Sequence, residues 1–187
     1  MGREWIDEGL RDERDREAFY LLAAERRRRE ASTIRAKGPE LMRRLVAEAG
    51  AVVDEYRRKI GGGSTAGEYE TLPHEGFSLA RTQWPKVVLE CRPDYAAHAL
   101  ACSMTRTDDH DSDPTEWLFA LTLTLDESDD VRLLHGPRLF KNAEEAAECL
   151  LKPVLFPLLE QGPVPSLVEI ATNAARKAPS GPAVSGR

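Results

Sequence analysis

Polar and apolar side chains alternate along the middle of the chain, and this period of two restricts the fold more than any other feature of the sequence. Alternation predicts strands with one buried face and one wetter face. Short polar turns separate the runs, and strands joined by short turns pair antiparallel. We therefore expect a β-meander of four to five strands within residues 76–136. Its clearest strand carries apolar side chains at Trp117, Phe119, Leu121, Leu123 and Leu125.

Helical periods flank these strands. Between residues 39 and 60 apolar side chains recur every three or four positions, which predicts a helix with one face packed on the sheet. These side chains are Leu41, Leu45, Ala49, Val52, Tyr56 and Ile60. Asn142, with Glu145 three residues later, is typical of a helix start, so we expect helices within residues 142–177. Pro153 and Pro157 are expected to kink or break the first of them, because proline lacks an N–H and clashes with the preceding turn.

These elements predict an α+β fold with long N-terminal helices, an antiparallel meander, and a C-terminal helix packed on one sheet face. A chain of 187 residues suits one ordinary domain. We place that domain at residues 38–178, after a charged helical arm at residues 1–37. The sequence Lys37-Gly38-Pro39 is expected to break the helix between them. Residues 179–187 are small and rich in proline and glycine, which predicts a disordered tail.

The order of helix, meander and capped helix, with the stretch from Asn142 to Phe156, resembles that of bacterial α+β proteins. The resemblance reaches no family of known activity, so it implies no functional residues.

The charge balance argues against nucleic acid as the main partner. The formal net charge is −6, whereas proteins that bind nucleic acid usually present a basic footprint. Four consecutive arginines, at residues 26–29, spread around a helix at ~100° per residue and form no single face. Glu25 and Glu30 flank them, so we interpret the run as ion-paired within the helix. An acidic partner or a nucleic acid is the alternative.

The cysteines and the absence of long apolar runs predict a soluble, cytoplasmic protein. Cys91, Cys102 and Cys149 are odd in number and have no CxxC spacing, which favours reduced thiols. The first ten residues have no apolar run after basic residues, so we expect no signal peptide. No 18 consecutive residues are apolar, so we expect no membrane partner.

An acidic loop is the most suggestive local feature for metal chemistry. Asp109, Asp111 and Asp113 stand at alternate positions, as at the start of a calcium-binding loop. Pro114 occupies the place where such a loop needs glycine, and Ala120 the place where it needs glutamate. These three aspartates are therefore weak candidates, and we expect a solubilising loop without metal. The glycines of residues 61–67 are not followed by Gly-Lys-Ser/Thr, so no phosphate cradle or cofactor is expected.

No catalytic motif is found, which favours a non-catalytic protein. The cysteines are best explained as small buried side chains. An alternative is a small-molecule-binding domain, or an enzyme, with an apolar pocket between sheet and helices. The residues expected to line that pocket are His98, Cys102, Met104 and Trp117.

The favoured function is an interaction or accessory module that assembles through its N-terminal helices. Phe19, Tyr20, Leu21 and Leu22 form an apolar cluster in an otherwise charged arm. Clustered aromatic residues dominate interface energetics, so Phe19, Tyr20 and Leu22 are the candidate contact residues. The simplest partner is a second copy of the chain, because two-fold assemblies are the commonest, and another protein is the alternative. The same cluster could instead fold back onto the helices of its own domain.

Overall fold

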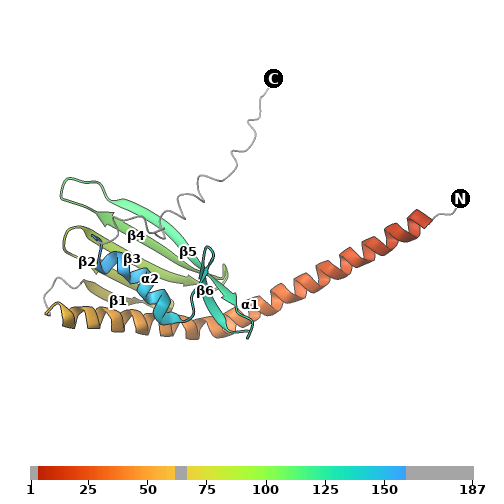
Figure 1. The fold of residues 1–187 in the computed structure, drawn as a ribbon, viewed down its shortest axis with the longest axis horizontal. Coiled ribbons are helices and arrows are strands. Elements are labelled where there is room, and N and C mark those ends of the chain that lie inside the picture. The colour runs from red at the N-terminus through yellow and green to blue at the C-terminus, as the bar shows by residue number, and fades with distance from the viewer. Residues whose placement is uncertain (1–3, 62–66, 159–187) are drawn as a thin grey trace, which may run out of the picture.

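The computed structural model describes residues 4–61 and 67–158. One long helix precedes a seven-stranded sheet, and a second helix follows it (Figure 1). The strands are antiparallel and lie in sequence order from β1 to β7, so the sheet is a meander. The α+β class and the antiparallel sheet are confirmed, but the expected strand count was too low. The elements are α1 (Glu4–Lys59), β1 (Glu68–Leu72), the 3₁₀ turn η2 (Pro73–Glu75), β2 (Gly76–Arg81), β3 (Lys86–Asp94), β4 (Ala99–Thr107), β5 (Thr115–Leu125), β6 (Val131–His135), β7 (Arg138–Leu139) and α2 (Ala143–Leu155).

The two additional strands lie at the two edges of the sheet. β1 has no alternating apolar pattern, and only Tyr69 and Leu72 of its side chains are half-buried. It is held by main-chain pairing with β2, from Glu68 opposite Ala80 to Leu72 opposite Gly76. β7 has only two residues and pairs with the end of β6. Short, exposed edge strands leave no hydrophobic period in the sequence, so pattern analysis passes over them.

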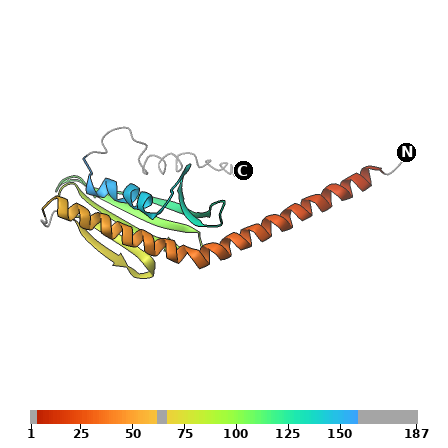
Figure 2. The same cartoon turned by 60° about the horizontal axis from the view of Figure 1, so that its bottom comes forward.

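The helix break expected at Lys37-Gly38-Pro39 is wrong, because α1 is continuous across it. Packing explains the continuity. Gly38 is buried, and a Cβ atom at this position would lie 3.1 Å from Cε1 of Tyr95. Ile34 and Met42, one turn to either side, are both fully buried. α1 bends where it leaves the domain (Figure 2), and a proline inside a helix is a known cause of such a bend.

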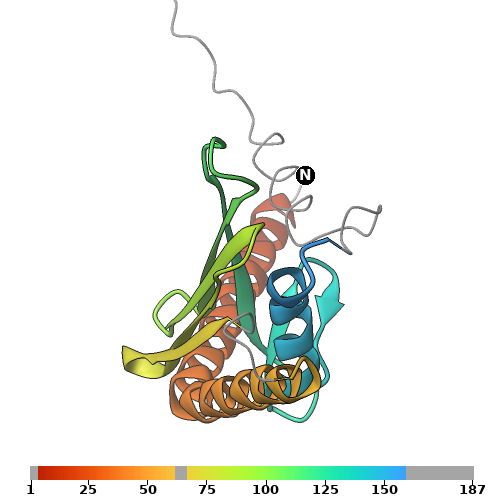
Figure 3. The same ribbon diagram turned by 90° about the vertical axis from the view of Figure 1, so that its left-hand side faces the viewer.

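Both helices pack against one face of the sheet (Figure 3). Rows of paired residues keep their side chains on that face, as in Leu89, Met104 and Trp117 across β3, β4 and β5. The row next to it points the other way, and there Leu118 is 69% exposed. The strand faces therefore follow the expected alternation. His98 is the exception, since it lies in the turn before β4 with φ of 53° and not on the strand.

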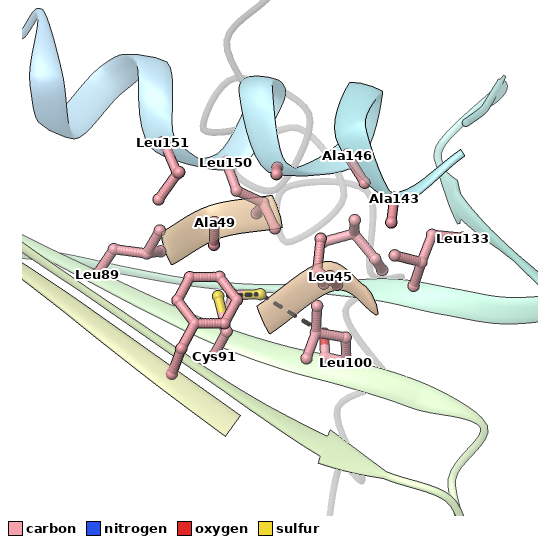
Figure 4. Close-up of a cluster of buried hydrophobic side chains, with 14 of the residues drawn as sticks. Leu45, Ala49, Leu89, Cys91, Leu100, Leu133, Ala143, Ala146, Leu150 and Leu151 are labelled. Carbon is pink, nitrogen blue, oxygen red and sulfur yellow. Dashed lines mark hydrogen bonds between the residues drawn. The ribbon is translucent and has the colours of Figure 1, made fainter. Parts of the chain in front are cut away.

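The core fills the space between sheet and helices. In Figure 4 side chains of α1, α2 and the strands point toward one another. The apolar face of α1 is confirmed, but Met42 and Val53 are its buried residues where Leu41 and Val52 were expected. The fully buried side chains of α1 are Ile34, Met42, Leu45, Ala49 and Val53, while Leu41, Val52 and Tyr56 are half-buried and Ile60 is exposed.

The start of α2 is as expected. Asn142 Oδ1 accepts a hydrogen bond from the N–H of Glu145 at 2.9 Å. Glu145 Oε2 in turn accepts from the N–H of Lys141 at 2.9 Å, so the reciprocal bond reaches one residue further back than in a standard capping box. α2 passes through Pro153 and ends at Leu155, before Pro157. The part of the expected helical region 142–177 that follows residue 158, and the tail at 179–187, lie outside the described residues.

Candidate interaction surface

The N-terminal half of α1 extends away from the domain (Figure 1). Every residue from Glu8 to Arg29 is exposed, except Ala23, which is half-buried. The first fully buried side chain of α1 is that of Ile34. We call residues 8–29 of α1 the arm. In this structure the arm projects and does not fold back onto its own domain.

The apolar cluster of the arm faces solvent. The exposed fractions of Phe19, Tyr20, Leu21 and Leu22 are 69%, 69%, 62% and 66%. The rings of Phe19 and Tyr20 contact each other edge to face, with their centroids 6.2 Å apart. Four consecutive positions spread around a helix at ~100° per residue, so these exposed side chains do not share one face, and only Phe19 and Leu22 lie on the same side.

The base of the arm is held by the turn between β5 and β6. Arg29 Nη2 lies 2.5 Å from Asp129 Oδ2. Lys37 Nζ donates to the main-chain oxygen of Asp129 at 2.8 Å and lies 3.3 Å from Asp130 Oδ1. The expectation of ion pairs within the helix therefore does not account for Arg29, whose carboxylate partner lies 100 residues away.

Asp126 organises that turn. Its Oδ1 accepts from the N–H groups of Ser128 and Asp130 at 2.9 and 3.0 Å, and its Oδ2 accepts from Arg132 Nε at 2.8 Å. The hydrogen bond from Arg132, followed by those from the main chain, lowers the pKa of Asp126 below its ordinary value. The turn that receives Arg29 and Lys37 is thus fixed by its own hydrogen bonds.

A groove runs between the arm and this turn. The arm contributes Leu22, Glu25, Arg26, Arg29 and Glu30 to its lining, and the domain contributes Thr124, Leu125, Asp126 and Asp129. A second, shallower hollow lies further along the same helix and is lined by Asp12, Asp15, Arg16, Phe19 and Tyr20. The apolar cluster is evident from the sequence but this groove is not, because nothing in the sequence pairs the arginine run with an acidic turn 100 residues later.

The four candidate pocket residues do not form one set. Cys102 and Met104 are buried in the core, and Met104 pairs with Trp117 across β4 and β5. Trp117 is half-buried and packs against the same core. His98 lies in the turn before β4. The three strand residues serve the packing between sheet and helices.

In the acidic loop, the carboxylate of Asp109 accepts hydrogen bonds from other residues of the same loop. Asp109 Oδ1 accepts from the N–H of Asp111 at 3.0 Å and from Ser112 Oγ at 2.7 Å. The hydrogen bond from Ser112 is the main reason that the pKa of Asp109 is lowered. Across the described residues, no group of three His, Cys, Asp or Glu side chains is arranged to hold a metal ion.

Cys91 and Cys102 lie opposite each other on β3 and β4, with their sulfur atoms 3.3 Å apart. Both are buried free thiols. Burial, and then the hydrogen bond to Cys102, raise the pKa of Cys91 well above its ordinary value. A thiolate nucleophile needs the opposite shift, so the pair has the properties of core side chains.

Comparison with protein-family models, with curated proteins and with solved structures finds no match for this chain. Among the described residues, no helix has both the length and the apolar character needed to cross a membrane.

Proposed function

We propose that this protein is a non-catalytic interaction or accessory module that assembles with a second copy of itself through the arm. The observation that carries the proposal is the exposure of Phe19, Tyr20 and Leu22 on a helix that projects from the domain. The odd number of cysteines without CxxC spacing, with Cys91 and Cys102 as buried thiols, is the basis for placing the protein in the cytoplasm.

The energetics of the arm support a partner. A solvated helix without tertiary contacts is marginally stable in water, and most helical stability in proteins comes from packing of an apolar face. Burying a side chain such as Phe or Leu stabilises an assembly by about 1.5–3 kcal/mol. In a two-fold symmetric dimer, each residue of the cluster is buried in both copies and contributes to the stability of the dimer twice. The same cluster would serve a different protein partner in the same way, and that is the alternative occupant.

The alternative of a small-molecule pocket between sheet and helices gains no support from the described residues. The side chains expected to line it are either core residues or, for His98, part of a turn. A binding or catalytic function between the sheet and the helices would need a cavity in a space that core side chains fill.

The experiment is sedimentation equilibrium of the full-length chain over a wide range of concentration. We expect a reversible dimer, and we expect the double variant Phe19→Ala/Leu22→Ala to be monomeric. Both substitutions remove exposed side chains, so the fold should be unaffected. The matched control is Leu118→Ala, because Leu118 is also 69% exposed but lies on the open face of the sheet. A wild-type chain that is monomeric throughout would refute the proposal. So would a dimer that only Leu118→Ala disrupts.

A further inference from the structure

The arm is electrically polar along its length. Residues 8–17 contain five acidic and three basic side chains, whereas residues 25–29 contain one acidic and four basic ones. The apolar cluster lies between these two halves. Two such helices in parallel would bring like charges together, while two in antiparallel orientation would bring the acidic half of each against the basic half of the other.

One stripe of the arm carries this pattern in register. Asp12, Asp15, Phe19, Leu22, Arg26 and Arg29 recur at alternating steps of three and four. Positions at this spacing share one side of a helix and are the positions that meet in a two-helix coiled coil; here only Phe19 and Leu22 among them are apolar. The groove and the shallower hollow both lie along this stripe. The hollow is lined by Asp12, Asp15 and Phe19, and the groove by Leu22, Arg26 and Arg29. The stripe is therefore a continuous exposed face.

The stripe is complementary to itself when it is reversed. If Phe19 of one copy packs against Leu22 of the other, Asp15 meets Arg26 and Asp12 meets Arg29, and each contact occurs twice about a two-fold axis. Arg11 and Arg16 flank the stripe in the acidic half, and Glu25 and Glu30 flank it in the basic half, so the edges are complementary as well. Ala18 and Ala23 beside the axis are small enough to let the helices approach closely.

The groove at the base of the arm lies at the basic end of the stripe, where Arg26 and Arg29 line it. Glu25, Glu30, Asp126 and Asp129 line it as well, so the charge contacts of the pairing rest on Arg26 and Arg29 alone. In the antiparallel pair, the acidic half of the second arm enters this groove. Arg29 is already beside Asp129, and its guanidinium group has further N–H donors for the partner's carboxylate.

We propose that the second copy binds through an antiparallel, two-fold pairing of the arms over residues 12–29, centred between Phe19 and Leu22. This inference rests on the proposed function and adds the orientation, the register and the charge contacts that specify it. The paired segment is roughly 27 Å long, from the helical rise of about 1.5 Å per residue.

Charge reversal in the full-length chain tests the register. We expect Asp15→Arg alone and Arg26→Glu alone to raise the dimer dissociation constant roughly tenfold at low salt, because each places like charges together at two sites. The double variant Asp15→Arg/Arg26→Glu restores opposite charges and should return the constant to near the wild-type value. These two residues are chosen because neither makes the Arg29–Asp129 ion pair.

A spin label attached through Glu13→Cys tests the orientation directly. With Cys149→Ala as background, only the buried Cys91 and Cys102 remain as native thiols. In the antiparallel pair the two labels are offset by about 22 Å along the helix axis, whereas in a parallel pair the offset is about zero.

The outcomes separate the inference from the function on which it rests. Monomeric wild-type protein overturns both. Two results would overturn the antiparallel pairing and still leave the arm as the contact, provided that Phe19→Ala/Leu22→Ala disrupts the dimer. One is that neither charge reversal weakens the dimer. The other is that the two labels lie side by side. Weakened single variants, a restored double variant and separated labels establish the pairing.

Discussion

Arg29 and Asp129 are 100 residues apart in the chain, and Nη2 of the guanidinium lies 2.5 Å from Oδ2 of the carboxylate. This ion pair joins the last turn of the arm to the turn between β5 and β6. Lys37, two turns further along α1, contacts the same turn through Asp129 and Asp130. The direction in which the arm leaves the domain is thus set by the bend in α1 and by two basic side chains on one acidic turn.

The ion pair orients the arm more than it stabilises the fold. The side chains of Arg29 and Asp129 are 75% and 53% exposed, and exposed pairs contribute no more than about 1 kcal/mol. We therefore expect Asp129→Asn, which tolerates the φ of 58° at this position, to lower the free energy of unfolding by less than about 1 kcal/mol. Urea unfolding would measure this. A much larger loss would show that the turn carries the stability of the domain.

The stabilisation that Asp126 provides to that turn depends on pH. Its pKa is lowered in the folded state, so its folded value lies below the value of about 3.9 for an unfolded aspartate. The stabilisation is complete above the unfolded value and is lost as pH falls through the folded value. Asp126→Asn should therefore lower the melting temperature at pH 7, and its difference from wild type should shrink on acidification below about pH 4. A difference that stays constant with pH would contradict this account.

Gly38 and Gly9 make a matched pair within α1. A Cβ at Gly38 would lie 3.1 Å from Tyr95 Cε1, and Tyr95 is held by a 2.6 Å hydrogen bond to Glu75. At Gly9 nothing lies within 4 Å. Alanine gains about 1 kcal/mol over glycine inside a helix, whereas overpacking costs about 1–3 kcal/mol. We expect Gly38→Ala to destabilise the protein and Gly9→Ala to increase helicity, as measured by thermal unfolding and circular dichroism. Stabilisation by Gly38→Ala would show that Tyr95 moves aside freely.

The end of α2 is fixed by side chains from α1 and the sheet. Tyr56 Oη and Arg81 Nη1 each donate to the main-chain oxygen of Leu155 at 3.3 Å. Arg106 Nη1 donates to the oxygen of Pro157, also at 3.3 Å. Tyr56→Phe removes one of these donors and should reduce the free energy of unfolding by about 1 kcal/mol. Its control, Tyr20→Phe on the arm, is measured in the Phe19→Ala/Leu22→Ala background, where the arm makes no contact with a second copy, and should have no effect on stability. Equal effects of the two substitutions would show that the bond to Leu155 is not made in solution.

Thiol reactivity distinguishes the three cysteines. Cys91 and Cys102 are buried, and the pKa of Cys91 is raised, while Cys149 is half-buried. We expect a thiol reagent to modify Cys149 first in the native protein and all three after denaturation. Cys149→Ala should remove the fast phase. A fast phase that persists in this variant would mean that the core between β3 and β4 opens readily.

Much of this fold could be predicted from the spacing of hydrophobic residues in the sequence. Burial alternates over most of the strands from β2 to β6, and the buried residues of α1 recur about every three or four positions, so the sequence indicates these elements well. The edge strands β1 and β7 are held by main-chain hydrogen bonds, which any sequence can make. The helix break was expected because glycine and proline act locally, but the burial of Gly38 against Tyr95 outweighs that preference. The same limit applies to the arm: its apolar cluster is visible in the sequence, whereas the contact of Arg29 with Asp129 depends on tertiary structure.

The central claim is that the arm is the contact between two copies of this chain. The most direct test is sedimentation equilibrium of wild-type protein beside Phe19→Ala/Leu22→Ala, with Leu118→Ala as control. We predict a concentration-dependent dimer for wild type and for the control, and a monomer for the double variant. A wild-type chain that stays monomeric at every concentration, or a double variant that dimerises as well as wild type, would contradict the claim.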